Sequence, residues 1–280
     1  MAKLLEGKFV AEIIKEQLRS EIANLKIAPV LASIIVGNNS SSLAYIKSQE
    51  KTAISLGIIY KLHKFPENIS EKELADFIIR LNQDKSINGV ILQRPLPLVL
   101  DYIKISSMIS AGKDVEGIHP SNMGRLVFGK SGIYACTAGA VMELLKSTGI
   151  DLYGKEAVIV GSSEIVGKPI ALLLLEKFAT VTVCHIATSE AGRLKEHVKR
   201  AEILIVAVGR AGLIKGQWIK KGAIVIDVGI NRLNDLIVGD VDFKTAEKRA
   251  SFITPVPGGV GPLTVVILMR NLIEATKLQQ

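Results

Sequence analysis

Residues 157–169 place an apolar strand pattern directly before a glycine turn and the start of a helix. The apolar run at 157–160 ends at Gly161, and a helix is predicted to begin just after Ile165. Glycine at such a turn lets phosphate oxygens approach the backbone, and the unpaired N–H groups and positive dipole end of the helix attract an anion. The glycine spacing is not G-x-G-x-x-G, so the segment by itself also fits an ordinary strand-to-helix turn of an α/β domain.

Three further apolar, β-branched runs follow at residues 180–185, 202–209 and 222–229, with helical stretches between them. Continuous apolar strands that alternate with helices indicate a parallel sheet covered on both faces, so we predict a Rossmann-like nucleotide lobe. The end of the second strand carries Cys184, His185 and Ile186, with no carboxylate to hold a ribose 2′-hydroxyl. This favours NADP over NAD.

The first part of the chain also alternates helix and strand. We predict helices at 10–25 and 43–56, strands at 29–36, 57–63 and 89–93, and a capping box at 70–73 that opens another helix. The fold class is therefore α/β with two lobes: an N-terminal substrate lobe at 1–119 and a nucleotide lobe at 120–262. A last helix at 263–280 can return to the first lobe, and the substrate is expected in a cleft facing the cofactor.

Composition narrows the function classes. The net charge of +8 is spread along the chain, only 5% of the residues are aromatic, and no recognition motif appears, so a nucleic-acid partner is not favoured. No apolar run approaches the ~20 residues that span a bilayer, so we expect no membrane partner and a cytoplasmic location. Cys136 and Cys184 lack a C-x-x-C pattern or a nearby histidine cluster, so we predict packed thiols, no disulfide and no metal site.

Longer motifs point to one family. They are GVILQRPLP at 89–97, KDVEGIHP at 113–120, GAIVIDVGINR at 222–232 and ITPVPGGVGP at 253–262. With these runs the chain resembles the methylenetetrahydrofolate dehydrogenase/cyclohydrolase family, the bifunctional FolD proteins, over nearly its whole length. The resemblance implies hydride transfer from 5,10-methylenetetrahydrofolate to NADP, hydrolysis of the methenyl product to 10-formyltetrahydrofolate, and a homodimer.

The resemblance also carries catalytic positions. The family has a tyrosine and, four residues later, a lysine on one helix face; Tyr45 matches the tyrosine, but Gln49 stands at the lysine position. Gln93 matches the family's glutamine beside that lysine. Glutamine forms hydrogen bonds but cannot deliver a proton, and losing a positioned acid or base costs roughly 10²- to 10⁴-fold in proton-dependent steps. We therefore expect dehydrogenase activity to exceed cyclohydrolase activity.

Binding positions follow by the same matching. The implied substrate contacts are Tyr45, Gln93, Asp114, Glu116, Pro257, Gly258 and Gly259, and the implied cofactor contacts are Gly161, Ser162, Ser163, Ile165, Val166, Gly167 and Ile230. Glu116 replaces the family's aspartate as the acceptor for pterin N–H groups, which keeps the charge and adds a methylene. Ser162 stands where some members have arginine and Ile186 where many have serine, so the preference for NADP is expected to be smaller than in those members.

Two alternatives remain open at this stage. One is a monofunctional dehydrogenase. The other is a degenerate paralogue that binds folate or nucleotide without useful turnover, which the altered pocket positions favour. The intact Tyr45, Gln93, Asp114 and residues 255–262 argue against complete loss of function.

Overall fold

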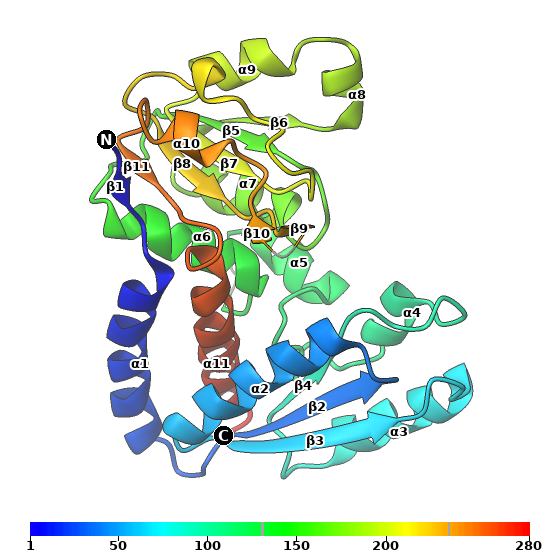
Figure 1. Cartoon of the computed structure of the whole chain (residues 1–280). Coiled ribbons are helices and arrows are strands. Elements are labelled where there is room, and N and C mark those ends of the chain that lie inside the picture. The colour runs from blue at the N-terminus through cyan, green and yellow to red at the C-terminus, as the bar shows by residue number, and fades with distance from the viewer. Residues whose placement is uncertain (130–131, 235) are drawn as a thin grey trace. The chain divides into compact units, whose positions relative to one another are not determined.

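The computed structural model of the protein describes residues 1–129, 132–234 and 236–280 (Figure 1). They form two compact units, and each unit combines segments that are distant in the sequence. The six-stranded unit contains Met1–Glu12 and Thr137–Thr264, and the three-stranded unit contains Ile13–Cys136 and Val265–Gln280. These units divide at residues 136–137. The functional boundary at residues 119–120 stays a prediction.

The six-stranded unit is built on a parallel sheet. Its order is β1 (Lys3–Leu4), β11 (Phe252–Ile253), β8 (Ile224–Asp227), β7 (Ile203–Val206), β5 (Glu156–Val160) and β6 (Thr180–Cys184), and all neighbouring strands are parallel. Every residue of β7 and β8 is buried, because helices cover both faces of such a sheet. The predicted α/β fold with a parallel sheet is confirmed. Strands β1 and β11 have two residues each, too few to show a periodicity.

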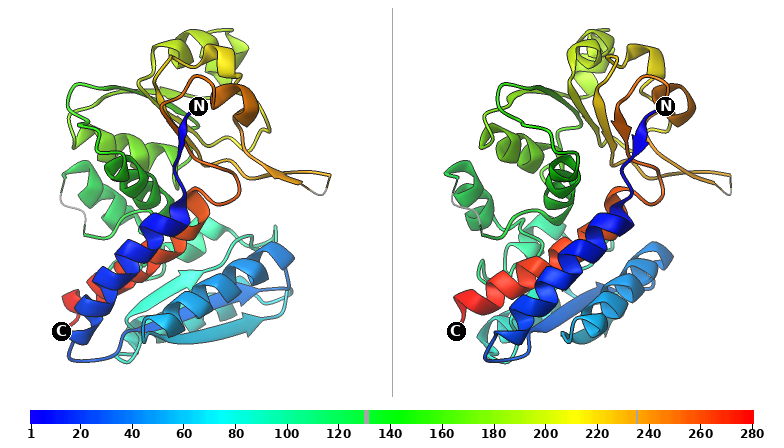
Figure 2. Two further views of the ribbon diagram at one scale, coloured as in Figure 1. Left: turned by 60° about the vertical axis from the view of Figure 1, so that its left-hand side comes forward. Right: turned by 90° about the vertical axis from the view of Figure 1, so that its left-hand side faces the viewer.

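The remaining elements of this unit lie around the sheet. They are α6 (Cys136–Ser147) from residue 137, α7 (Gly167–Leu175), α8 (Ile186–Glu190), α9 (Leu194–Arg200), the 3₁₀ turn Gly216–Trp218 and α10 (Phe243–Ala246). Strands β9 (Asn231–Leu233) and β10 (Leu236–Val238) pair antiparallel, and both views of Figure 2 show this hairpin projecting from its unit. The sequence analysis did not predict the hairpin.

The strand order places a ligand site at one edge of this sheet. From β5 the chain goes to β6, which lies beside β5 on one side. It then goes to β7, which lies beside β5 on the other side, so the order in which strands are added to the sheet reverses between β5 and β7. Ligands of open α/β sheets bind outside the carboxyl ends of the strands at such a switch point. Gly161 follows β5 and Ala207 follows β7, so the predicted phosphate turn lies at the switch point.

The three-stranded unit has a smaller parallel sheet in the order β3 (Ile59–Phe65), β2 (Val30–Val36) and β4 (Gly89–Leu92). One face packs on α3 (Glu71–Gln83) through an aliphatic core that includes Ile34, Leu74 and Ile78. Helix α3 begins with the predicted capping box: Ser70 Oγ accepts from Glu73 N–H, and the Glu73 carboxylate accepts from Ser70 N–H. Helices α2 (Ser40–Ser55), α4 (Tyr102–Ser106) and α5 (Pro120–Val127) complete the unit with the parts of α1 (Gly7–Ala23) and α11 (Val260–Leu278) that belong to it.

The final helix returns to this unit, as predicted. Asn271 Nδ2 donates to the carbonyl oxygens of Val115 and Tyr134 at 2.8 and 2.9 Å. The helix also lies so close to β4 that a Cβ on Gly89 would stand 2.6 Å from Leu272 Cδ1. Glycine at residue 89 is therefore what allows α11 to pack against the end of the sheet.

Candidate functional site

Helix α2 carries the predicted tyrosine and glutamine of the catalytic set. The helix begins after Asn39, whose Oδ1 accepts from Ser41 N–H and Ser42 N–H at 3.1 Å. Ser42 Oγ donates to the carbonyl oxygen of Arg94, in the loop that follows β4. This bond ties the start of α2 to the carboxyl end of β4, and Gln93 lies at that end.

The predicted catalytic glutamines meet in a buried hydrogen-bond network. Gln49 is fully buried, and its Oε1 accepts from Gln93 Nε2 and from the Tyr60 hydroxyl, both at 2.8 Å. Gln93 Nε2 also donates to Ser33 Oγ at 2.9 Å. Strand β2 provides Ser33, β3 provides Tyr60, and α2 covers this face of the sheet. The structure therefore brings Gln49 and Gln93 together, and it adds Ser33 and Tyr60, which the sequence analysis did not single out.

Tyr45 lies one helical turn before Gln49 and is only partly buried. Burial raises the pKa of its hydroxyl far above the ordinary value, Cys136 and Glu116 add to the rise, and the Gln49 side chain opposes it. Gln49 Nε2 is buried without a hydrogen-bond partner among the described residues. Tyr45, Gln49 and Glu116 are close enough to interact electrostatically.

Glu116 is held by an aromatic residue on α4. Its Oε2 accepts from the Tyr102 hydroxyl at 2.9 Å, and the Arg94 guanidinium lies over the Tyr102 ring, 3.6 Å from its centre. Burial and then the nearby Asp114 raise the pKa of Glu116 to about 7, while Tyr102 and Arg94 oppose the rise. A carboxyl group with this pKa changes its charge near neutral pH.

The rest of the KDVEG segment holds its own turn in place. Lys113 Nζ donates to the carbonyl oxygens of Leu81 and Asp84 at the end of α3. The Asp114 carboxylate accepts from the N–H groups of Gly117 and His119 and from Asn122 Nδ2, at 2.8–3.1 Å. Both oxygens of Asp114 therefore have partners within the turn, and substrate contact by Asp114 stays a prediction.

The glycine turn of the six-stranded unit packs so closely against neighbouring backbone that two of its positions cannot carry a side chain. Gly161 has a φ of +123°, and a Cβ there would stand 2.2 Å from the Ala207 carbonyl oxygen. A Cβ on Gly167 would stand 2.0 Å from the Gly161 carbonyl oxygen. Helix α7 begins at Gly167, and the residue before it, Val166, makes no side-chain capping bond. Lys168 N–H donates to the Ser163 carbonyl oxygen at 3.0 Å, and Pro169 has no N–H. A tight turn with glycine at both ends, followed by the start of a helix, fits a bound phosphate.

The other predicted cofactor positions lie around this turn. Ser162, Ser163, Ile165 and Val166 are partly buried between β5 and α7. Ile186, just after β6, and Ile230, just after β8, are 76% and 70% exposed. Residues 184–187 at the end of β6 contain no carboxylate, the group that usually accepts from a free ribose 2′-hydroxyl at this position.

Two aspartates that hold the neighbouring loops were not among the predicted site residues. The Asp240 carboxylate accepts from the consecutive N–H groups of Val208, Gly209 and Arg210, at 2.7–3.0 Å. Asp227 accepts from Gly229, Asp240 and Val241 N–H. Burial raises the pKa of Asp227 to about 6. The segment GDVD at 239–242 was noted as a motif, but only the fold shows that Asp240 shapes the loop after β7.

Residues 257–259 belong to the six-stranded unit, whereas Tyr45, Gln49, Gln93 and Glu116 belong to the three-stranded unit. Gly258 accepts from Gly7 N–H at 2.9 Å, and a Cβ on Gly7 would stand 1.7 Å from the Gly259 carbonyl oxygen. The glycine-rich loop is thus fixed on the start of α1.

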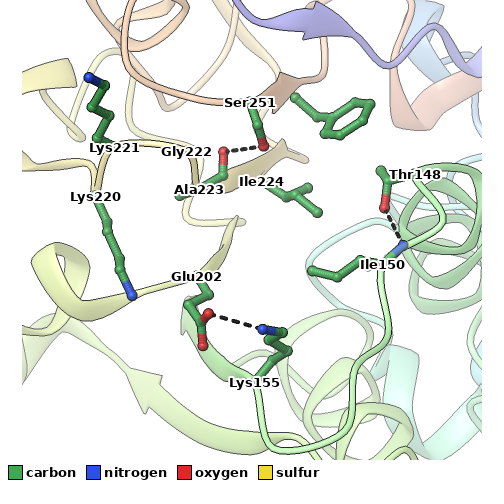
Figure 3. A pocket seen from close by; sticks show the side chains of 11 residues that line it. Thr148, Ile150, Lys155, Glu202, Lys220, Lys221, Gly222, Ala223, Ile224 and Ser251 are labelled. Carbon is green, nitrogen blue, oxygen red and sulfur yellow. Dashed lines mark hydrogen bonds and ion pairs between the residues drawn. The ribbon is translucent and has the colours of Figure 1, made fainter.

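A separate hollow of about 330 Å³ lies at the amino ends of the strands of the six-stranded sheet (Figure 3). Lys155 and Glu202 line it and form an ion pair at 3.3 Å, and Lys220 lies on the facing segment. The Gly161 turn lies at the carboxyl ends of the same sheet. This hollow is therefore distinct from the predicted phosphate site.

Comparison with known proteins covers both units. Residues 5–116 match the model of the tetrahydrofolate dehydrogenase/cyclohydrolase catalytic domain, and residues 135–280 match that of the NAD(P)-binding domain of the same family. The "Bifunctional protein FolD" of Acetivibrio thermocellus is 49% identical over 99% of this chain and 98% of the relative. The chain belongs to the tetrahydrofolate dehydrogenase/cyclohydrolase family. The predicted resemblance is confirmed.

Solved structures of the tetrahydrofolate dehydrogenase/cyclohydrolase family have the same fold. The bifunctional FolD enzyme of Campylobacter jejuni has a TM-score of 0.96 and 44% identity, with all of both chains covered. The FolD protein of Trypanosoma brucei, solved with NADP and an inhibitor, has a TM-score of 0.94 and 38% identity and covers 99% of this chain and 98% of its own. Among the described residues, no helix is both long and apolar enough to cross a membrane.

Proposed function

We propose that this protein oxidises 5,10-methylenetetrahydrofolate to the methenyl compound with NADP as hydride acceptor, and hydrolyses that product to 10-formyltetrahydrofolate more slowly. Membership of the family along both units supports the two activities. The proposal of unequal rates rests on Gln49, which stands at the position that is lysine in the family. Its buried amide oxygen accepts hydrogen bonds from Tyr60 and Gln93.

The three-stranded unit is proposed to hold the folate. The Glu116 carboxylate accepts hydrogen bonds from the pterin amino group and ring N–H, a pairing of two parallel bonds that a carboxylate makes well. Tyr45 and Gln93 orient the one-carbon group, and Asp114 keeps the turn that presents Glu116. Pro257, Gly258 and Gly259 are retained as substrate contacts from the six-stranded unit.

The six-stranded unit is proposed to hold NADP. Bound NADP supplies the acceptor for the hydride that leaves the methylene carbon. The turn of Gly161, Ser162 and Ser163 and the start of α7 bind the phosphates through N–H groups. Ile165, Val166, Gly167 and Ile230 are proposed to pack against the nucleotide. The lack of a carboxylate after β6 favours a 2′-phosphate over a free hydroxyl.

Hydride transfer depends chiefly on how the two reactants are positioned, so it does not need an acid or base at residue 49. Hydrolysis does need proton transfer, because water must lose a proton as it attacks the methenyl carbon. The Gln49 amide neither accepts nor releases a proton at neutral pH. The titratable groups near Tyr45 include its own hydroxyl, whose pKa is raised far above neutral by burial, and Glu116, whose pKa is raised to about 7.

A monofunctional dehydrogenase is the limiting case of this proposal, with hydrolysis too slow to matter. We further propose a homodimer in the cytoplasm, as the resemblance implies. A degenerate paralogue is less well supported, because the glycine turn and the Glu116 site both keep their geometry.

The test is an assay of the purified protein that follows NADPH formation and loss of the methenyl compound at separate wavelengths. We expect both activities, with oxidation the faster. Binding of a folate analogue and NADP without any NADPH formation would favour the degenerate paralogue.

A further inference from the structure

Tyr102 holds the carboxylate of the KDVEG segment that has acceptor sites to spare. The neighbouring Asp114 is buried, and both of its oxygens already accept hydrogen bonds within its turn. Glu116 is only partly buried, and of the described side chains Tyr102 alone donates a hydrogen bond to its carboxylate, at Oε2. Because a carboxylate offers about four acceptor sites, Oε1 and the second site of Oε2 are left for a ligand.

The Tyr102 ring is fixed by the helix that carries it and by a cation. Tyr102 is the first residue of α4, whose N-cap residue Asp101 accepts from Lys104 N–H at 3.1 Å, and its ring packs against the aliphatic core of the three-stranded unit. The Arg94 guanidinium lies 3.6 Å from the ring centre. The hydroxyl is 2.9 Å from the Glu116 carboxylate, whereas its other acceptor, the Leu92 carbonyl oxygen, is 3.4 Å away.

This hydrogen bond acts on a side chain with more freedom than the family's residue has. A glutamate has one more rotatable bond than the aspartate that the resemblance implies at residue 116. Ordering a mobile side chain when a ligand binds weakens the affinity, and a side chain that is already held avoids this cost. The Tyr102 hydroxyl holds the Glu116 carboxylate before a ligand arrives.

The titratable and charged groups that face Glu116 lie on several elements. They are Tyr102 of α4, Arg94 after β4, Asp114 of the same turn, Tyr45 of α2 and Cys136 of α6. Burial raises the pKa of the Tyr45 hydroxyl and of the Cys136 thiol, so both are neutral near pH 7. Burial and Asp114 raise the pKa of Glu116, whereas the Tyr102 hydroxyl and Arg94 lower it. Tyr102 is thus a donor that favours the ionised carboxylate.

We propose that Tyr102 is a positioning residue for folate binding: its hydroxyl holds Glu116 Oε2 so that the open edge of the carboxylate meets the amino and ring N–H groups of the pterin. The inference rests on the proposed function, in which Glu116 binds the pterin. It assigns Tyr102 a role through Glu116 and not through contact with the substrate.

The test combines Tyr102→Phe with Glu116→Asp in a double-mutant cycle. The affinity for a non-reactive folate analogue is measured by calorimetry across a pH range that brackets 7. Tyr102→Phe keeps the ring against the core and removes only the hydroxyl, so we expect the analogue to bind about threefold to tenfold more weakly at the alkaline end. The pH at which the affinity has fallen by half should rise by about one pH unit, because the ionised carboxylate loses a donor.

The aspartate background separates the role of Tyr102 from a general loss of structure. There the carboxylate is one methylene shorter and falls short of the Tyr102 hydroxyl, so Tyr102→Phe should change the affinity by less than about twofold. NADP affinity should be the same in all four proteins. Tyr153→Phe, at a tyrosine that is 70% exposed, is the matched control and should change neither the affinity nor its pH dependence.

Each outcome decides the inference. A purely structural role would lower the melting temperature of Tyr102→Phe and leave the pH dependence of binding unchanged. A direct contact of Tyr102 with the pterin would give the same loss with glutamate and with aspartate at residue 116. Either result overturns the proposal. A wild-type protein that does not bind the analogue, or a Glu116→Ala variant that binds it equally well, overturns the proposed folate site itself, and the role of Tyr102 falls with it.

Discussion

Replacing Gln49 with lysine restores the family's residue inside an environment that has adapted to an amide. The lysine would occupy a fully buried position, and Oε1, which now accepts from Tyr60 and Gln93, would be lost. Burial favours the neutral amine by lowering the lysine pKa. A neutral amine accepts one hydrogen bond, so one of the two donors is left without an acceptor, at a cost of about 1–3 kcal/mol.

The same change supplies a group that can carry a proton. A positioned acid or base contributes about 10²- to 10⁴-fold, and a lysine in a network built for glutamine should recover a fraction of this, roughly tenfold or more in hydrolysis. Oxidation should change less, because it depends on positioning. We therefore expect Gln49→Lys to melt several degrees lower and to hydrolyse the methenyl compound faster.

The assay compares Gln49→Lys with Gln49→Met at saturating folate. Methionine has a similar size, removes the same acceptor and cannot carry a proton, so it controls for the lost hydrogen bonds. Hydrolysis and NADPH formation are followed separately, and thermal melting reports stability. If both variants bind a folate analogue and hydrolyse the methenyl compound at equal rates, the assignment of residue 49 as the limiting position is wrong.

Four further predictions concern the binding sites. Glu116→Ala should abolish measurable binding of a folate analogue and Glu116→Asp should tighten it; equal calorimetric affinities for all three proteins would refute the site. The pterin donors bind the ionised Glu116 carboxylate, whose pKa is raised to about 7, so the affinity of the wild type for the analogue should fall as the pH drops through 7. Binding should also release a proton below this pH. An affinity that does not change with pH would contradict the prediction. Gly161→Ala should lower the free energy of unfolding by about 1–3 kcal/mol and weaken NADP binding, because the new Cβ would clash with the Ala207 carbonyl oxygen. An unchanged melting temperature would refute the claim that the turn requires glycine at residue 161. Ser162→Arg should widen the preference for NADP over NAD, because a guanidinium can make two hydrogen bonds to a phosphate, and tighter NAD binding by the wild type would overturn the cofactor assignment.

Local patterns were enough to predict the elements that position both sites. The apolar runs at 157–160, 203–206 and 224–227 became buried parallel strands, because a sheet covered on both faces requires continuous apolar sequence. The capping box at Ser70 and Glu73 formed because its hydrogen bonds join residues three apart. The two-residue strands β1 and β11 were missed because their pairing depends on a partner about 250 residues away.

The sequence by itself determined the parallel α/β architecture and the glycine turn after residue 160, since each is written in residue types that are close along the chain. That Gln49 stands in place of a proton carrier stays a prediction from the family resemblance. Only the tertiary structure decided that Gln49 is fully buried, that Tyr60 and Gln93 hold its oxygen, and that Tyr102 holds Glu116. The Gln49 contacts join residues 11 and 44 positions apart, and they exist because the register of β2, β3 and β4 brings Tyr60 and Gln93 to one face of the sheet. The contact of Tyr102 with Glu116 joins α4 to a turn 14 positions further along the chain. No local pattern contains either relation.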